Sequence, residues 1–249
     1  MQLLKMNDWC GRGAGIGLLL ALMLVMNVAA VQAKTKPLKP AQAPKKIQLT
    51  YALSRDDQLF AHTKETFTQE GKQYRIQSVT KGVGVYALLG ERKLLSHGNV
   101  TKDGLQPLHF ESLQLKNASK SLINDFDWTQ KVLRMQVKGE SKEVVLEPGT
   151  QDLLSVMYQF RFAPPTGTQV AWPVTTGKKL KRQQYQVTAS TQALQTAAGH
   201  FNVMMLVDTD DSDSKTIYLA NESFFIPVKI VMKERGTTIV QELTKIAFN

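Results

Sequence analysis

Residues 148–165 read PGTQDLLSVMYQFRFAPP, and their pattern differs from that of the remaining chain. Polar and apolar residues do not alternate after Asp152, and Pro164-Pro165 cannot continue a helix. The stretch therefore predicts one helix from Asp152 to about Phe162. Apolar residues surround most of this helix, so we expect it to be largely buried. Its narrow polar stripe consists of Asp152, Ser155 and Gln159.

The sequence on both sides of this helix alternates with a period of two, as half-buried strands do. Near the start of the fold, the apolar residues Ile47, Leu49, Tyr51 and Leu53 alternate with polar or small residues. Turn signals such as Arg235-Gly236 separate many segments of this kind. Short strands joined by tight turns favour antiparallel, up-and-down pairing over βαβ units. The fold class is therefore mainly β, a meandering antiparallel sheet with one helix packed on its concave face.

The segment PLHFESLQL (107–115) departs from simple alternation. Its apolar residues move from Leu108 and Phe110 to Leu113 and Leu115, which is a change of face. A β-bulge inserts one extra residue and re-aims the side chains that follow it. We therefore expect a bulge near Glu111-Ser112.

Residues 1–33 have the features of a secretory signal peptide. Lys5 and Arg12 precede an apolar run over 16–28, and small or modest side chains follow at Val31-Gln32-Ala33. This run is shorter than the roughly 20 residues that a membrane-spanning helix needs. We expect cleavage after Ala33 and export to the periplasm. A retained N-terminal anchor is the alternative.

Residues 34–46, KTKPLKPAQAPKK, form a basic Pro/Lys-rich tether with five lysines and no acidic residue. Such a segment cannot bury apolar surface and should be extended. Of the net charge of +10, five units lie in this tether and one in the leader, so the body from Ile47 carries only +4. That charge does not favour nucleic acid as a partner. The tether itself suits transient contact with an anionic membrane surface.

Cysteine and histidine give no support to a cofactor or metal site. The one cysteine, Cys10, lies in the leader, which excludes disulfides and thiolate chemistry from the processed chain. The four histidines are scattered without metal-binding spacing. The acidic run 208–213 lacks the glycine and glutamate of a calcium loop, and we interpret it as a solvated hairpin loop. We therefore predict no cofactor and no metal.

Two interpretations of Asp152 and Ser155 remain open. Asp152 is well placed to cap the helix N-terminus, with Ser155 hydrogen-bonding back one turn later. The other interpretation makes them an acid and a nucleophile, with His200 as the base. No spacing rule supports this trio, and capping is favoured.

Five strings are distinctive in their order and spacing: SHGNVTKDGLQPLHFES (96–112), NDFDWTQKV (124–132), PGTQDLLSVMYQFRF (148–162), LQTAAGHFNVMMLV (194–207) and IPVKIVMKERGTTIVQEL (226–243). Together they resemble the "domain of unknown function 3108" family of exported bacterial proteins. The resemblance covers nearly all of 47–249 and implies a single domain there. It also implies a Gram-negative envelope location and a sheet curled into an open or half barrel around a helix. It implies no activity.

Two classes of function follow from these observations. The favoured one is a non-enzymatic cell-envelope protein that binds an amphiphile, such as a lipid, or another envelope component. Its ligand would lie against large side chains of the helix, because concave and mostly apolar sites bind small amphiphiles. The candidates are Met157, Tyr158, Phe160 and Phe162. The alternative is a hydrolase-like enzyme that uses Asp152, Ser155 and His200.

The leader generates the first testable prediction. Protein produced in a Gram-negative cell should begin at Lys34 and be released by osmotic shock, because Val31-Gln32-Ala33 precedes the cleavage point. N-terminal sequencing of the released protein measures this directly. Detection of Met1 on membrane-bound protein would contradict it and favour the retained anchor.

Overall fold

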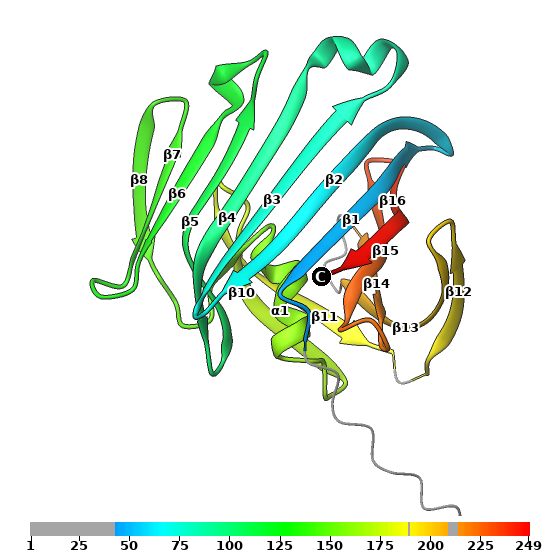
Figure 1. Cartoon of the computed structure of the whole chain (residues 1–249). Coiled ribbons are helices and arrows are strands. Elements are labelled where there is room, and N and C mark those ends of the chain that lie inside the picture. The colour runs from blue at the N-terminus through cyan, green and yellow to red at the C-terminus, as the bar shows by residue number, and fades with distance from the viewer. Residues whose placement is uncertain (1–42, 189, 209–213) are drawn as a thin grey trace, which may run out of the picture. The chain divides into compact units, whose positions relative to one another are not determined.

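The computed structural model describes residues 43–188, 190–208 and 214–249. Within the described residues, sixteen strands form one curved sheet (Figure 1). The first eight are β1 (Lys46–Arg55), β2 (Gln58–Glu70), β3 (Gln73–Gly82), β4 (Glu91–Thr101), β5 (Gly104–Gln114), β6 (Leu122–Asp127), β7 (Val132–Val137) and β8 (Glu140–Val145). The others are β9 (Gln151–Asp152), β10 (Gln169–Thr175), β11 (Leu180–Val187), β12 (Gln192–Thr196), β13 (Gly199–Asp208), β14 (Ser214–Ala220), β15 (Ile226–Glu234) and β16 (Thr237–Phe248).

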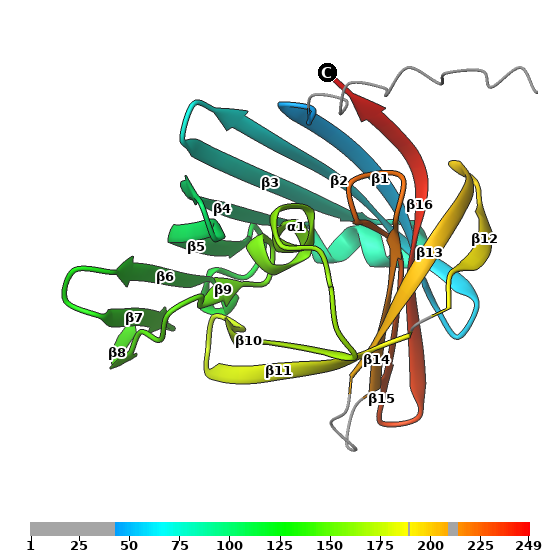
Figure 2. The ribbon, with the colours of Figure 1, turned by 90° about the horizontal axis from the view of Figure 1, so that it is seen from below.

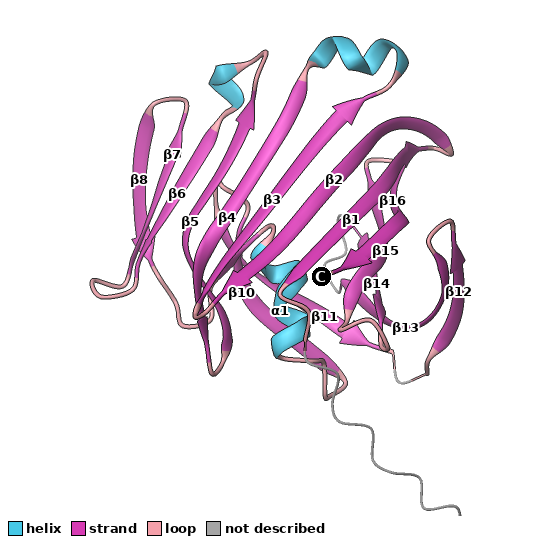
Figure 3. Cartoon of the chain, viewed as in Figure 1, coloured by secondary structure: helices cyan, strands magenta, loops and turns pink. Residues whose placement is uncertain are grey.

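Helices are few and short (Figure 3). In the part of the chain that the structure describes, they are α1 (Ser155–Phe162) and two 3₁₀ turns, η1 (Gly84–Leu89) and η2 (Ala118–Lys120). Across the described ranges, none of the helices has the length and apolar character needed to cross a membrane.

The sheet consists of two meanders that meet where β1 pairs with β16. Its strand order is β8-β7-β6-β5-β4-β3-β2-β1-β16-β15-β14-β13-β11-β10-β9, with β12 paired to β13. Every pairing is antiparallel except that of β9 with β10. The ladder does not close, so β8 and β9 remain its two ends. The predicted fold class, a mainly antiparallel open barrel, is confirmed.

Irregular register helps to bend this sheet, because an extra residue in one strand increases local twist. One irregularity lies where His97 pairs with His109 and Gly98 pairs with Pro107, which leaves Leu108 without a partner. The predicted bulge near Glu111-Ser112 was therefore misplaced. Phe110 and Ser112 both face the core at 0% and 4% exposure, so alternation is regular across that dipeptide. Leu113 and Leu115 belong to the outer face.

Helix α1 lies in the hollow of the sheet (Figure 2), as the sequence predicted. It joins two groups of core side chains. Tyr158 stacks on Phe67 with ring centroids 4.9 Å apart, whereas Phe160 packs among Tyr185, Leu206 and other residues of the second group. A helix that is apolar on most sides suits this enclosed position.

The helix begins at Ser155 and not at Asp152, which corrects the predicted boundary. Gln151 and Asp152 are extended because they pair in parallel with Val174 and Thr175 of β10. The predicted end at Phe162 agrees with the structure.

Side-chain hydrogen bonds connect the two arms of the open barrel where the ladder does not. Thr175 on β10 donates its hydroxyl to Asn124 Oδ1 on β6 over 2.8 Å. Asn124 Nδ2 donates to the carbonyl oxygen of Gly177, at 3.1 Å. Thr175 and Asn124 are both fully buried, so these bonds form away from water. The curvature of the barrel thus depends on polar contacts as well as on apolar packing.

Candidate functional site

Asp152 organises the start of the helix. Its Oδ1 accepts hydrogen bonds from the backbone N–H groups of Leu154 (2.8 Å) and Ser155 (2.9 Å). The hydroxyl oxygen of Ser155 accepts in return from the backbone N–H of Asp152, at 2.8 Å. This reciprocal arrangement satisfies N–H groups that would otherwise lack partners in a buried turn. Asp152 therefore caps the turn that leads into α1.

The second carboxylate oxygen of Asp152 reaches across to the sheet. Ser96 on β4 donates its hydroxyl to Asp152 Oδ2 over 2.6 Å. Ser96 has only that one proton, so the neighbouring hydroxyl of Tyr74, 3.0 Å away, donates to Ser96. All three side chains are buried. Burial raises the pKa of the Asp152 carboxyl above its ordinary value, and the hydrogen bonds from Ser96, Ser155 and Leu154 oppose that rise.

Two glutamines attach the helix to the turn between β4 and β5. Gln159 accepts from the backbone N–H of Leu105 (2.7 Å) and donates to the carbonyl of Asp103 (2.8 Å). Gln151 donates to the carbonyl of Leu105, at 2.8 Å. The Gln159 amide lies directly over Gly104, where any Cβ would collide with it. Glycine is required at 104 for this approach and for its φ of +105°.

A second buried carboxylate faces the helix from β2. Glu65 accepts a hydrogen bond from the hydroxyl of Tyr158 over 3.0 Å. Burial raises the pKa of Glu65 to about 7, although hydrogen bonds from Tyr158 and Ser78 oppose that rise. Glu65 thus changes charge near neutral pH inside the core.

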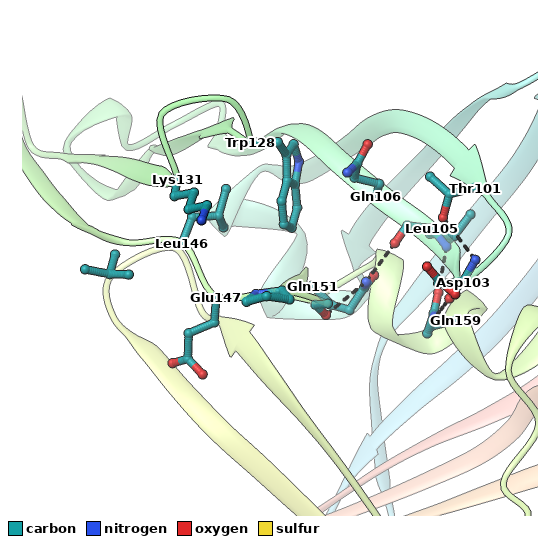
Figure 4. A pocket seen from close by; sticks show the side chains of 13 residues that line it. Thr101, Asp103, Leu105, Gln106, Trp128, Lys131, Leu146, Glu147, Gln151 and Gln159 are labelled. Atoms are coloured by element: carbon teal, nitrogen blue, oxygen red, sulfur yellow. Dashed lines mark hydrogen bonds between the residues drawn. The ribbon is translucent and has the colours of Figure 1, made fainter.

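A pocket of about 420 Å³ opens beside the glutamines (Figure 4). It lies between the β4–β5 turn, the β6–β7 turn and the segment that leads from β8 into β9. Its lining is mainly apolar, with a few polar groups. Thirteen residues contribute, among them Leu105, Trp128, Val145, Leu146, Gln151 and Gln159.

Two features of this pocket are fixed by hydrogen bonds. The indole N–H of Trp128 donates to the carbonyl of Pro107 over 2.6 Å, which holds the ring in place. Gln151 uses its amide nitrogen for the carbonyls of Leu105 and Gly149, at 2.8 and 3.2 Å. Its Oε1 is buried and has no hydrogen-bond partner among the described residues. Such a group normally has a partner, so Oε1 is an unsatisfied acceptor in a residue that lines the pocket.

The four predicted ligand-lining residues, Met157, Tyr158, Phe160 and Phe162, pack into the core and differ in how deeply they are buried. Tyr158 and Phe160 are fully enclosed, and Phe160 packs edge-on against Trp172 with centroids 5.2 Å apart. Met157 and Phe162 are half-buried against the same core. Within the described ranges, none of these four side chains lines the pocket at Trp128. Their packing therefore does not support a ligand role, because they fill the hollow of the sheet. Gln159, from the predicted polar stripe, is the helix residue that borders the pocket.

The hydrolase interpretation requires a third residue that the structure does not bring to this place. Asp152 and Ser155 are buried together, whereas His200 is exposed on β13, opposite Gln195 of β12. The polar partners of Asp152 and Ser155 are Ser96, Tyr74 and backbone groups. In the described part of the chain, no group of three or more His, Cys, Asp or Glu side chains could hold a metal ion. The predicted acidic loop lies mainly at 209–213, outside the described residues.

The sequence alone did not predict the pocket at Trp128. It also did not predict the partners of Asp152 on the sheet, Ser96 and Tyr74. Trp128 lies in NDFDWTQKV (124–132), one of the five strings that carry the family resemblance, and the string by itself indicates no pocket. Ser96 and Tyr74 are ordinary strand residues, and only the fold places them near Asp152. Gln151, a polar residue directly before a buried helix, is the one signal that could have suggested a polar contact there.

Comparison with known families gives a match over most of the chain. The family model "Protein of unknown function (DUF3108)" matches residues 49–244. The chain belongs to the DUF3108 family. The DUF3108 protein has no match among curated proteins. Its fold is similar to the crystal structure of a beta-barrel-like protein of domain of unknown function DUF1849 from Brucella abortus, with a TM-score of 0.56 and 13% identity over 84% of this chain and 99% of the other.

The Asp152 network of the DUF3108 protein generates a stability prediction. Asp152→Ala should lower the free energy of unfolding by about 2 kcal/mol or more, because it leaves two buried backbone N–H groups without an acceptor. Asp152→Asn should lose much less, since its amide oxygen still accepts from Leu154 and Ser155. Urea unfolding of both variants measures the difference. Equal losses would mean that the negative charge, and not the acceptor geometry, is what this position needs.

Glu65 generates a prediction about pH. A carboxyl whose pKa is higher in the folded state stabilises the fold at low pH, and this contribution is lost as pH rises through about 7. Glu65→Gln keeps an acceptor for Tyr158 but cannot ionise. Its stability relative to the wild type should therefore increase by about 2 kcal/mol between pH 5 and pH 8.

Urea midpoints at the two pH values test this expectation. Glu70→Gln is the matched control, because Glu70 is an exposed carboxylate on the same strand. A difference between Glu65→Gln and wild type that stays constant with pH would refute the prediction.

Proposed function

We propose that this protein is an exported, non-enzymatic cell-envelope protein that binds a small amphiphile in the pocket at Trp128. The observation that carries the proposal is the combination of an apolar pocket with the unpartnered Oε1 of Gln151. An amphiphile would place its apolar part against the lining and a hydroxyl, amide or amine donor at Oε1.

The dimensions and lining of the pocket support this class of ligand. About 420 Å³ is within the range of about 300–1,000 Å³ that is usual for small-molecule sites. Trp128, Leu146 and Val145 supply the apolar wall, and the fixed indole is already in position before binding. A preformed site loses little conformational entropy when it binds.

The leader supports the proposed periplasmic location. A signal peptide over 1–33 would deliver the domain to the periplasm, where amphiphiles and other envelope components need to be kept from water. The hydrolase alternative, with Asp152, Ser155 and His200, gains no supporting observation. The two buried residues of that trio are already used in capping the helix turn.

A binding assay with a matched pair of variants tests the pocket. The fluorescent apolar amine N-phenyl-1-naphthylamine, whose N–H can donate to Oε1, should bind the processed protein, and Val145→Trp should weaken binding by about tenfold or more, equivalent to about 1.4 kcal/mol. Val145 is 74% exposed at the pocket wall, so the larger side chain can obstruct the pocket without disturbing the core. Ser141→Trp is the control, since Ser141 is exposed on the same strand and lies outside the pocket lining.

Energy transfer locates the bound probe. Trp9 belongs to the leader, so Trp172→Phe leaves Trp128 as the sole tryptophan of the processed chain. Excitation of Trp128 should then sensitise emission of the bound probe. Native mass spectrometry of periplasmic protein would identify any natural ligand. The proposal would be contradicted if the wild-type protein bound no probe. It would also be contradicted if Val145→Trp and Ser141→Trp bound the probe equally well.

A further inference from the structure

The connection between β3 and β4 carries an unusual surface. Its sequence, GVGVYALLG (82–90), is almost entirely apolar, and no residue of the 3₁₀ turn η1 is buried. Figure 3 shows this turn at one end of the sheet, beyond the ends of the strands. The exposed fractions are 76% for Val85, 36% for Tyr86, 74% for Leu88 and 59% for Leu89.

Two neighbouring segments enlarge this surface. Leu59 is 49% exposed and precedes Phe60, which contacts the η1 segment. The carbonyl of Phe60 accepts a hydrogen bond from the backbone N–H of Val83, and its ring packs edge-on against Tyr86. Leu115, 57% exposed, follows β5, and its backbone N–H donates to the carbonyl of Glu91. We call these six side chains the apolar tip. They are Leu59, Val85, Tyr86, Leu88, Leu89 and Leu115.

The apolar tip has a defined conformation. Tyr86 donates its backbone N–H to the carbonyl of Val83, and Gly90 donates to that of Ala87. Gly84 and Gly90 have φ values of +56° and +77°, which let the chain turn sharply on each side of the helix. Lys116 also donates to the carbonyl of Leu88, at 3.2 Å. The exposed side chains are therefore presented by a hydrogen-bonded turn.

The surroundings of the apolar tip are more basic than acidic. Glu91 is already paired with Lys81 at 2.6 Å and lies 3.9 Å from Lys93. The carboxylates in these segments are Asp56, Asp57 and Glu91. The exposed cations are Arg55, Lys81, Arg92, Lys93 and Lys116.

We propose that the apolar tip docks on a phospholipid bilayer that contains anionic headgroups. Aliphatic side chains that project from a convex turn can enter the boundary between headgroups and acyl chains, with Tyr86 at headgroup level. The surrounding lysines and arginines complement anionic headgroups. Six side chains, four of them on one turn, are too few for a standard protein interface, which takes about 20–30 residues from each partner. This docking is independent of the proposed ligand pocket.

Vesicle sedimentation tests the docking. Processed protein, with its N-terminus verified by mass spectrometry, should sediment with vesicles of phosphatidylcholine and phosphatidylglycerol, and less with phosphatidylcholine alone. The double variant Val85→Ser with Leu88→Ser should bind the anionic vesicles at least about tenfold more weakly than the wild type, because it lacks two apolar side chains that would be buried in lipid. Both residues are highly exposed, so the variant should keep its fold. Phe248→Ser is the control, as a change of an exposed apolar residue outside the tip.

Insertion of the apolar tip into the bilayer can be measured by quenching of tryptophan fluorescence. A tryptophan introduced by Leu88→Trp should be quenched by vesicles with brominated acyl chains, whereas one introduced by Ser141→Trp should not. Unchanged vesicle binding by the double variant would overturn the proposal and assign binding to the basic segment 34–46. Absence of binding to vesicles of either composition would also overturn it. A dimer that dissociates in the double variant, without vesicle binding, would show that a second copy of the chain covers the tip.

Discussion

The rest of the structure depends on the buried carboxylate of Asp152, which has no cation beside it among the described residues. Asp152 is fully enclosed, and its hydrogen bonds come from two backbone N–H groups and the hydroxyl of Ser96. A buried charge is costly unless hydrogen bonds satisfy it, so these donors must stay where they are. One carboxylate oxygen holds the helix turn and the other holds β4. Asp152 therefore ties the turn before α1 to β4 through two differently oriented sets of donors.

This constraint explains how an open sheet keeps its curvature. The ladder ends at β8 and β9, so the backbone alone does not join the two arms. Asp152, Gln159 and Gln151 attach the helix and β9 to β4 and the following turn, while Asn124 and Thr175 connect β6 with β10. Apolar packing of Tyr158 and Phe160 fills the space between. The pocket at Trp128 lies beside this junction, where helix, turn and strand do not fill the space completely.

The sequence predicted the features that periodicity encodes. Alternation along Ile47–Ser54 and its repeats predicted antiparallel strands, and the segment without alternation before Pro164 predicted helix α1 and its burial. Periodicity does not encode contacts between distant strands, so Ser96 and Tyr74 could not be linked with Asp152. The same limit misplaced the bulge, because Leu108 is the extra residue only in relation to its partner strand. It also assigned ligand contacts to Tyr158 and Phe160, since large apolar side chains look alike whether they fill a core or line a cavity.

The two candidate surfaces lie at opposite ends of one strand. β4 begins at Glu91, next to the apolar tip, and ends at Thr101, which lines the pocket. At about 3.4 Å per residue, these ends are separated by roughly 30 Å. A protein docked through its tip would therefore hold the pocket away from the bilayer surface, on the side that faces the aqueous compartment. A ligand could then enter or leave without passing the docked turn, and a change at one surface need not disturb the other. The rigid hydrogen-bonded junction at Asp152 lies along the same strand, through Ser96, and would keep both surfaces in a fixed relation.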